Sequence, residues 1–252
     1  MRQPNNRELI KKYGVKIMAV CFWLLLWQLL SVYVKEAIFM ASPVEVLFTL
    51  LPMLREPDFW QTICFSFIRI VAGFVLAIVT GTILAVLAYR SFIFKELIQP
   101  IIIIMKSIPV ASFIILALIW IKAVNLSTLV SFLMVLPIIF TTVGEGLKST
   151  DQKLLQMATV FHVGRIKRLR AIYIPAVLPH YISAITIGLG FCWKAGIAAE
   201  VIGIPTGSIG ERLYEAKIFF MTKELFAWTV VIVLISILFE KLVMRLIKAF
   251  WQ

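Results

Sequence analysis

Several runs of about 20 mostly apolar residues divide this chain of 252 residues. Apolar residues make up 62% of the chain, whereas soluble domains contain about half. A helix of about 20 residues crosses the hydrocarbon core of a bilayer, and its backbone groups pair within the helix. The runs are too long and too evenly apolar for barrel strands. The sequence therefore predicts an all-α polytopic membrane protein with a single transmembrane domain over 1–252.

Six segments have the length and composition of transmembrane helices. They cover about residues 15–34, 62–89, 98–121, 126–143, 181–202 and 225–243. Helical spacing of apolar residues also predicts a short interfacial helix over 44–54. Sixteen of the 25 Lys and Arg residues fall in the two termini and in alternate connections, including 145–180, and six fall in the other connections. Because basic loops stay in the cytoplasm, we expect both termini and segment 145–180 to face the cytoplasm.

Segment 145–180 is a basic, polar stretch between apolar runs. Its six cationic residues are Lys148, Lys153, Arg165, Lys167, Arg168 and Arg170. Two short helices are expected, over 152–162 and 165–172, with Thr150 or Asp151 capping the first. One face of the first helix carries Leu154, Met157, Ala158 and Phe161. Pro175 and Pro179 are expected to end helical continuity before the fifth span.

Two interpretations of segment 145–180 follow from its pattern alone. In the first, the apolar face lies in the cytoplasmic leaflet while the cations contact anionic lipid. In the second, the apolar face docks in a groove of a cytoplasmic protein. Burying four such side chains gives roughly 5–8 kcal/mol before the costs of association. The pattern does not choose between them.

The same segment resembles the coupling motif of ABC importer permeases. That motif runs Glu-Ala-Ala, three residues, Gly, nine residues and Ile-x-Leu-Pro. Here Gln156, Met157 and Ala158 take the first place, and Ile172-Tyr173-Ile174-Pro175 takes the last. His162 stands where the motif has Gly, and the motif's Glu is also absent. Gly164, two residues later, is expected to supply the turn.

Other parts of the chain, over about residues 40–252, resemble the same family in order and spacing. They are Ser42-Pro43-Val44-Glu45-Val46-Leu47, Arg69 with Gly73-Phe74, Pro100 through Lys106 to Ile108-Pro109-Val110, Phe132 to Pro137, Glu200 with the turn Gly203–Gly210, and Trp251. Within the family, the chain is most similar to the nitrate, sulfonate and taurine permeases. The resemblance implies a bacterial inner-membrane permease that imports a small solute.

The resemblance also implies the partners of such a permease. They are a second permease copy, two cytoplasmic ABC ATPase subunits, an extracellular substrate-binding protein and membrane lipid. Nucleic acid is not among them. ATP and Mg would be bound by the ATPase, and this chain would hold no cofactor or metal. The residues expected to contact the ATPase are Leu154, Gln156, Met157, Ala158, Phe161, His162, Gly164 and Pro175.

Ionisable residues inside the predicted spans are candidates for a translocation path. Each such charge costs about 2.5–3.5 kcal/mol on insertion scales, so it faces an interior or a cavity. Lys106 and Lys194 would favour an anion such as nitrate or a sulfonate, although a thiamine-precursor pyrimidine also fits the family. The alternative is that both lysines snorkel or pair structurally. The full path set adds Pro109, where a kink is expected, together with Trp193 and Glu200.

Catalytic motifs are missing from the sequence. It has no GxxxxGK[ST] nucleotide loop, no HExxH and no GxSxG, and its three Cys residues lie inside apolar runs without a CxxC pair. Two further function classes remain as alternatives: an ion-coupled secondary transporter or channel that needs no ATPase, and a membrane-embedded enzyme acting on lipid. The first calls for intramembrane acids, and the second for clustered His, Asp or Glu near one interface.

Overall fold

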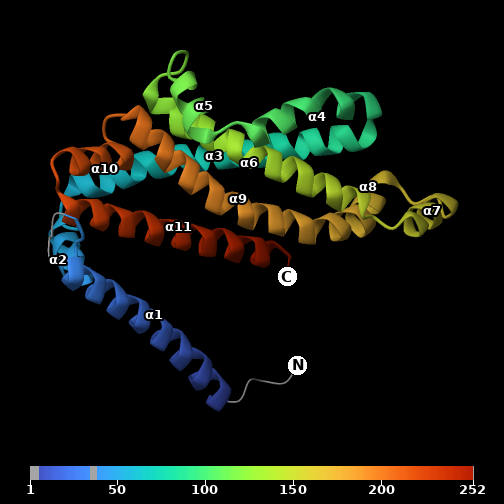
Figure 1. The fold of residues 1–252 in the computed structure, drawn as a ribbon. Helices are drawn as coiled ribbons and strands as arrows, with labels where there is room; N and C mark the ends of the chain where they lie inside the picture. Colours follow the sequence, from blue (N-terminus) through green and yellow to red (C-terminus); the bar gives the residue numbers. More distant parts are fainter. Residues whose placement is uncertain (1–5, 35–38, 252) are drawn as a thin grey trace. The chain divides into compact units, whose positions relative to one another are not determined.

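The computed structural model describes residues 6–34 and 39–251, and all regular structure in those ranges is helical (Figure 1). Arg2 and Lys35, which enter the charge count, lie outside these ranges. The helices are α1 (Asn6–Val34), α2 (Pro43–Met53), α3 (Pro57–Arg90), α4 (Phe92–Ser107), α5 (Val110–Ala117), α6 (Ala123–Lys148), α7 (Gln152–Val160), α8 (Arg165–Arg168), the π-helix η1 (Leu169–Tyr173), α9 (Ile174–Gly203), α10 (Ile209–Ile218) and α11 (Thr222–Trp251).

The chain divides into two compact units, residues 1–60 with 212–231 and residues 61–211 with 232–252. In the first, Ala41, Val46 and Ala227 form a small buried cluster. The Trp27 indole donates a hydrogen bond to the Ala41 carbonyl (3.0 Å) and stacks on Phe226. The helix predicted over 44–54 is confirmed as α2, and its interfacial position stays a prediction. The single-domain prediction stays a prediction.

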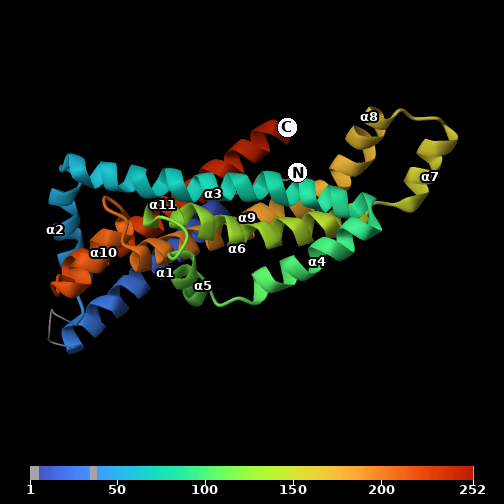
Figure 2. The ribbon, with the colours of Figure 1, turned by 90° about the horizontal axis from the view of Figure 1, so that it is seen from above.

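The core of the second unit is built from α3, α6 and α9. Figures 1 and 2 show α6 and α9 side by side, and the two helices are in extensive contact. Small residues bring the backbones together: a Cβ on Gly73 would overlap the Thr128 carbonyl, and one on Gly196 would lie 2.6 Å from Ile70. Close approach at small residues is the usual way in which membrane helices pack.

Four helical stretches among the described residues are long and apolar enough to cross a membrane: 14–34, 57–90, 123–148 and 165–203. A fifth is obtained if α4 and α5 count together, although they are bent by 104°. The predicted third span is therefore a broken one. α11 covers the predicted sixth span but is not among these candidates. The all-α membrane fold is confirmed, with four to five candidate spans instead of six.

The break between α4 and α5 occurs where Pro109 was expected to mark a kink. Pro109 is the N-cap of α5, and Ile108 has an extended backbone. The residue before a proline is disfavoured in the helical region, which stops α4 at Ser107.

The expectation that Pro175 and Pro179 end helical continuity is wrong. Pro175 lies in the first turn of α9 and Pro179 lies inside it, so the fifth span begins well before residue 181. The π-turn η1, directly before α9, changes the hydrogen-bond register ahead of these prolines. Segment 145–180 consequently contains only one fully separate helix, α7.

Candidate functional site

The α7 helix carries the apolar face predicted for segment 145–180. Asp151 caps its start, accepting a hydrogen bond from the Lys153 N–H at 2.8 Å. Ala158 is buried against the rest of the chain. Leu154, Met157 and Phe161, in contrast, are 47%, 54% and 73% exposed. Both views show α7 beyond the ends of α6 and α9 (Figures 1 and 2). On the predicted face, therefore, only the small Ala158 packs against the rest of the chain, and the three large side chains are exposed.

The turn after α7 is made at His162. This residue has φ +48°, in the left-handed region that favours glycine. Gly164 has φ −59°, an ordinary value, and a Cβ there would meet nothing within 4 Å. The expectation that Gly164 supplies the turn is therefore wrong. The left-handed residue lies at the position where the resembled motif has glycine, so the turn is retained although the residue is not.

The remaining coupling candidates, Gln156 and Pro175, have exposed side chains. Gln156 lies next to the exposed Met157 on α7. Pro175 lies in the first turn of α9, separated from α7 by α8 and η1.

The predicted path residues separate into two groups. Lys106, Pro109 and Lys194 are exposed on the surface of the chain. Lys194 lies on the face of α9 that also carries the exposed Ile187 and Phe191, while the residues on either side of it along the chain are buried. This face is uncovered at the level of a candidate span.

Trp193 and Glu200 form the other group, because both are buried within the chain. Trp193 is 2% exposed and packs against Phe67 and Phe239. Glu200 is completely buried, and its Oε2 accepts hydrogen bonds from the Ser66 hydroxyl (2.6 Å) and the Gly210 N–H (3.3 Å). Neither side chain offers a surface to a solute.

The Glu200 carboxylate belongs to a network that holds the turn between α9 and α10. Besides donating to Glu200, the Ser66 hydroxyl accepts from the Ile209 N–H (2.9 Å). Ile204, the C-cap of α9, has φ +47°. A β-branched residue rarely adopts this conformation, so the surrounding contacts must hold it there. Glu200 therefore acts as a positioning residue for the turn.

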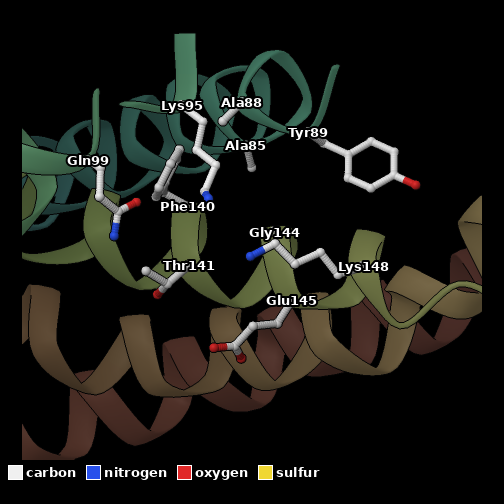
Figure 3. Close-up of a pocket in the computed structure, with 10 residues that line it drawn as sticks. All are labelled: Ala85, Ala88, Tyr89, Lys95, Gln99, Phe140, Thr141, Gly144, Glu145 and Lys148. Atoms are coloured by element: carbon white, nitrogen blue, oxygen red, sulfur yellow. The ribbon is translucent and has the colours of Figure 1, made fainter. Parts of the chain in front are cut away.

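A cavity of about 180 Å³ lies between α3, α4 and α6 (Figure 3). Figure 3 shows the amines of Lys95 and Lys148 turned toward this space, while the Glu145 carboxylate points away from it. Gln99 and Thr141 add polar groups to the lining. In the sequence, Lys95 counted only toward the charge bias, and Lys148 was one of the six cations of segment 145–180. Their convergence depends on the packing of α4 against α6, which helical periodicity does not reveal.

Among the described residues no cluster of three or more His, Cys, Asp or Glu side chains could hold a metal ion. The buried Ser66 was also missed by sequence reasoning. Serine is common in transmembrane helices, and nothing in its local sequence distinguishes it from a packing residue.

The sequence and the fold were compared with those of known proteins. The chain is 25% identical over 245 residues to the taurine transport system permease protein TauC of Escherichia coli, covering 95% of this chain and 88% of that protein. It is 23% identical to the putative aliphatic sulfonates transport permease protein SsuC of Bacillus subtilis, covering 96% and 87%. The bicarbonate transport system permease protein CmpB of Synechococcus elongatus is 26% identical over 160 residues, covering 63% and 57%.

A solved structure of the MetNI methionine ABC transporter in an inward-facing conformation has the same fold. Its matching chain has a TM-score of 0.55 and 18% identity, covering 75% of this chain and 93% of that one. The family model for binding-protein-dependent transport system inner membrane components matches residues 77–251, well over half of the sequence. The chain therefore belongs to the family of inner membrane components of binding-protein-dependent transport systems.

Proposed function

We propose that this chain is the membrane-spanning subunit of an ATP-driven importer and that α7 is the point at which a cytoplasmic ABC ATPase grips it. The observation that carries this proposal is the exposure of Leu154, Met157 and Phe161 on a helix that projects from the end of the bundle. Large apolar side chains that a chain leaves uncovered at one place mark an interaction surface. Family membership makes an ATPase the fitting partner, with α7 as the coupling helix.

The exposed Lys106 and Lys194 support a homodimer in which the solute crosses the membrane between the two copies. A lysine facing lipid in a span costs about 2.5–3.5 kcal/mol on insertion scales. A second protomer that faces the Lys194 side of α9 would enclose Lys106, Pro109 and Lys194 in a polar space. Closure of the ATPases on ATP would then draw the two α7 helices together and switch the path between inward- and outward-facing states.

We infer an anionic solute for this path. The relatives are named for taurine, aliphatic sulfonates and bicarbonate, all of which carry an acidic group. Cationic side chains on the exposed faces of α4 and α9 suit such a cargo. An external binding protein would deliver it, both termini and α7 would be cytoplasmic, and ATP with Mg would be held by the ATPase alone.

The proposal is tested by copurification with the ATPase and by ATP-driven uptake in proteoliposomes. Met157→Glu and Phe161→Asp place a charge in the exposed apolar face. We expect each to reduce ATPase copurification and uptake at least tenfold while the chain remains membrane-inserted. Gln152→Glu is the matched control, because it adds the same charge to the exposed first residue of α7 outside that face. Normal copurification of both variants would refute the role of α7.

A separate test addresses the path. Lys194→Met keeps the length and apolar stem of the side chain but removes its charge. We expect uptake of an anionic solute to fall while ATPase binding is unchanged. Unchanged uptake would remove Lys194 from the path and leave the role of α7 standing.

A further inference from the structure

A groove of about 380 Å³ lies beside α8, where the end of α3, the end of α6 and the start of the α8–η1–α9 stretch meet. Its apolar walls are formed by Val86, Leu147, Ile166 and Leu169. Ile166 and Leu169 are 70% and 51% exposed, so the groove is open. The groove is separate from the apolar face of α7, because no residue of α7 lines it.

Three guanidinium groups line the same groove, those of Arg90, Arg165 and Arg168. None of the lining residues, all of which are described, is acidic. The only hydrogen bond from the Arg168 guanidinium to another described side chain reaches the Thr159 hydroxyl (3.2 Å), and its buried Nε has no partner in the described part of the chain. A buried donor without an acceptor is costly, so the site lacks a group that accepts hydrogen bonds.

The position of these arginines indicates the kind of group that is missing. Arg90 is the last residue of one candidate span and Arg165 is the first of another. Lys148, at the end of α6, terminates a third. Helices of 34 and 39 residues are longer than the roughly 20 that cross the hydrocarbon core, so their basic ends extend to the headgroup layer or beyond it, where clustered basic residues attract anionic phospholipid.

The aromatic side chains complete this description. Tyr89 and Tyr173 both line the groove and contact each other edge to face, with ring centroids 6.2 Å apart. Figure 3 shows the ring of Tyr89 pointing away from Lys95 and Lys148. Tyrosines are enriched at the membrane interface because they have an apolar ring and a polar end.

We propose that this groove binds one anionic phospholipid, with the phosphate on Arg90, Arg165 and Arg168 and an acyl chain along Val86, Leu147, Ile166 and Leu169. A free phosphate would satisfy the cations but leave the apolar walls uncovered. A protein partner would be expected to add acidic residues, whereas a phospholipid supplies both a phosphate and a long apolar chain. The lipid would hold α8 at the membrane, so that α7 moves relative to a fixed α8.

The test measures phospholipid retained by the full chain in its purified complex, by native mass spectrometry after reconstitution in nanodiscs of phosphatidylglycerol and phosphatidylcholine. Each cation near such a surface changes the affinity by about fivefold. Arg90→Gln combined with Arg165→Gln should therefore lower phosphatidylglycerol retention by about twenty-five-fold. The matched control is Lys153→Gln combined with Arg170→Gln, which removes the same charge from residues outside the groove. It should change retention by less than about threefold.

Equal retention of phosphatidylcholine and phosphatidylglycerol by the wild type would overturn the proposal, as would equal losses in the two double variants. A second measurement does not depend on the variants folding. Phosphatidylglycerol with a photoreactive acyl chain should cross-link the wild-type chain at Val86, Leu147, Ile166 or Leu169. Cross-links found only elsewhere, or protection of the groove by the ATPase instead of lipid, would show that the groove belongs to another occupant.

Discussion

The turn after α9 and the segment α7–α8 differ in how many of their side chains have partners within the chain. In the turn, Glu200, Ser66 and the first backbone N–H groups of α10 bind one another in a buried network. In α7–α8, large apolar side chains and several cations have no partner in the described residues. The turn is held by hydrogen bonds within the chain, although Glu200 Oε1 has no partner among the described residues, whereas the exposed groups of α7–α8 call for a separate partner. Substitutions should therefore lower stability in the turn and lower binding in α7–α8.

The largest effect is expected from Gly210→Ala in the turn. An added Cβ would overlap the backbone and Cβ of Glu200, which a shift of side chains cannot relieve. We expect a loss of about 3 kcal/mol in the free energy of unfolding, measured by thermal unfolding in detergent. Gly190→Ala is the control, since a Cβ there meets nothing within 4 Å. Equal stability of the two variants would mean that the turn is not tightly packed.

Ser66→Ala should have the next largest effect. It removes the donor to Glu200 and the acceptor for the Ile209 N–H while leaving the volume almost unchanged. Buried groups left without partners cost about 2 kcal/mol here. Ser107→Ala, at an exposed hydroxyl bonded only to its own helix, should change stability by less than about 0.5 kcal/mol. If Ser66→Ala is as mild as its control, the network does not hold the turn.

In α7–α8 the expected change in stability has the opposite sign. His162→Gly relieves a left-handed backbone and should stabilise the chain by about 1 kcal/mol. Gly164→Ala should be tolerated, because this glycine has an ordinary φ and free space around it. Both variants can be compared with the wild type by thermal unfolding and by ATPase copurification. Destabilisation by His162→Gly would show that a contact of the imidazole stabilises the chain by more than the left-handed backbone conformation costs.

The smallest effect concerns Glu45, a half-buried carboxylate in the first turn of α2. The Ser42 backbone N–H and then Lys223 stabilise the Glu45 carboxylate and lower its pKa from 4.5 to about 2. Its contribution to stability is therefore present above about pH 4.5 and is lost as the pH falls toward 2. Glu45→Gln should lower the melting temperature slightly at pH 7 and make no difference near pH 2. A difference that persists at pH 2 would mean that the carboxylate charge is not its source.

Much of the fold could be predicted because lipid restricts the choice of structure. A span must be helical to pair its backbone groups, so apolar runs alone located α1, α3, α6 and most of α9. The α7 helix followed from its apolar periodicity, and the break near Pro109 followed from the chemistry of proline. The sequence also carried enough of the family pattern, in Gln156–Ala158 and Ile172–Pro175, to indicate the family that the comparison later showed.

The tertiary structure decided which polar residues are inside the protomer and which are outside. Lys194 and Glu200 both looked like intramembrane charges in the sequence, yet one is exposed and the other is completely buried. The same applies to Pro175 and Pro179, which a π-turn accommodates within a continuous helix, and to Arg90, which meets Arg165 and Arg168 only through helix packing. Hydropathy and spacing report on one helix at a time, whereas burial and convergence depend on which faces of several helices meet.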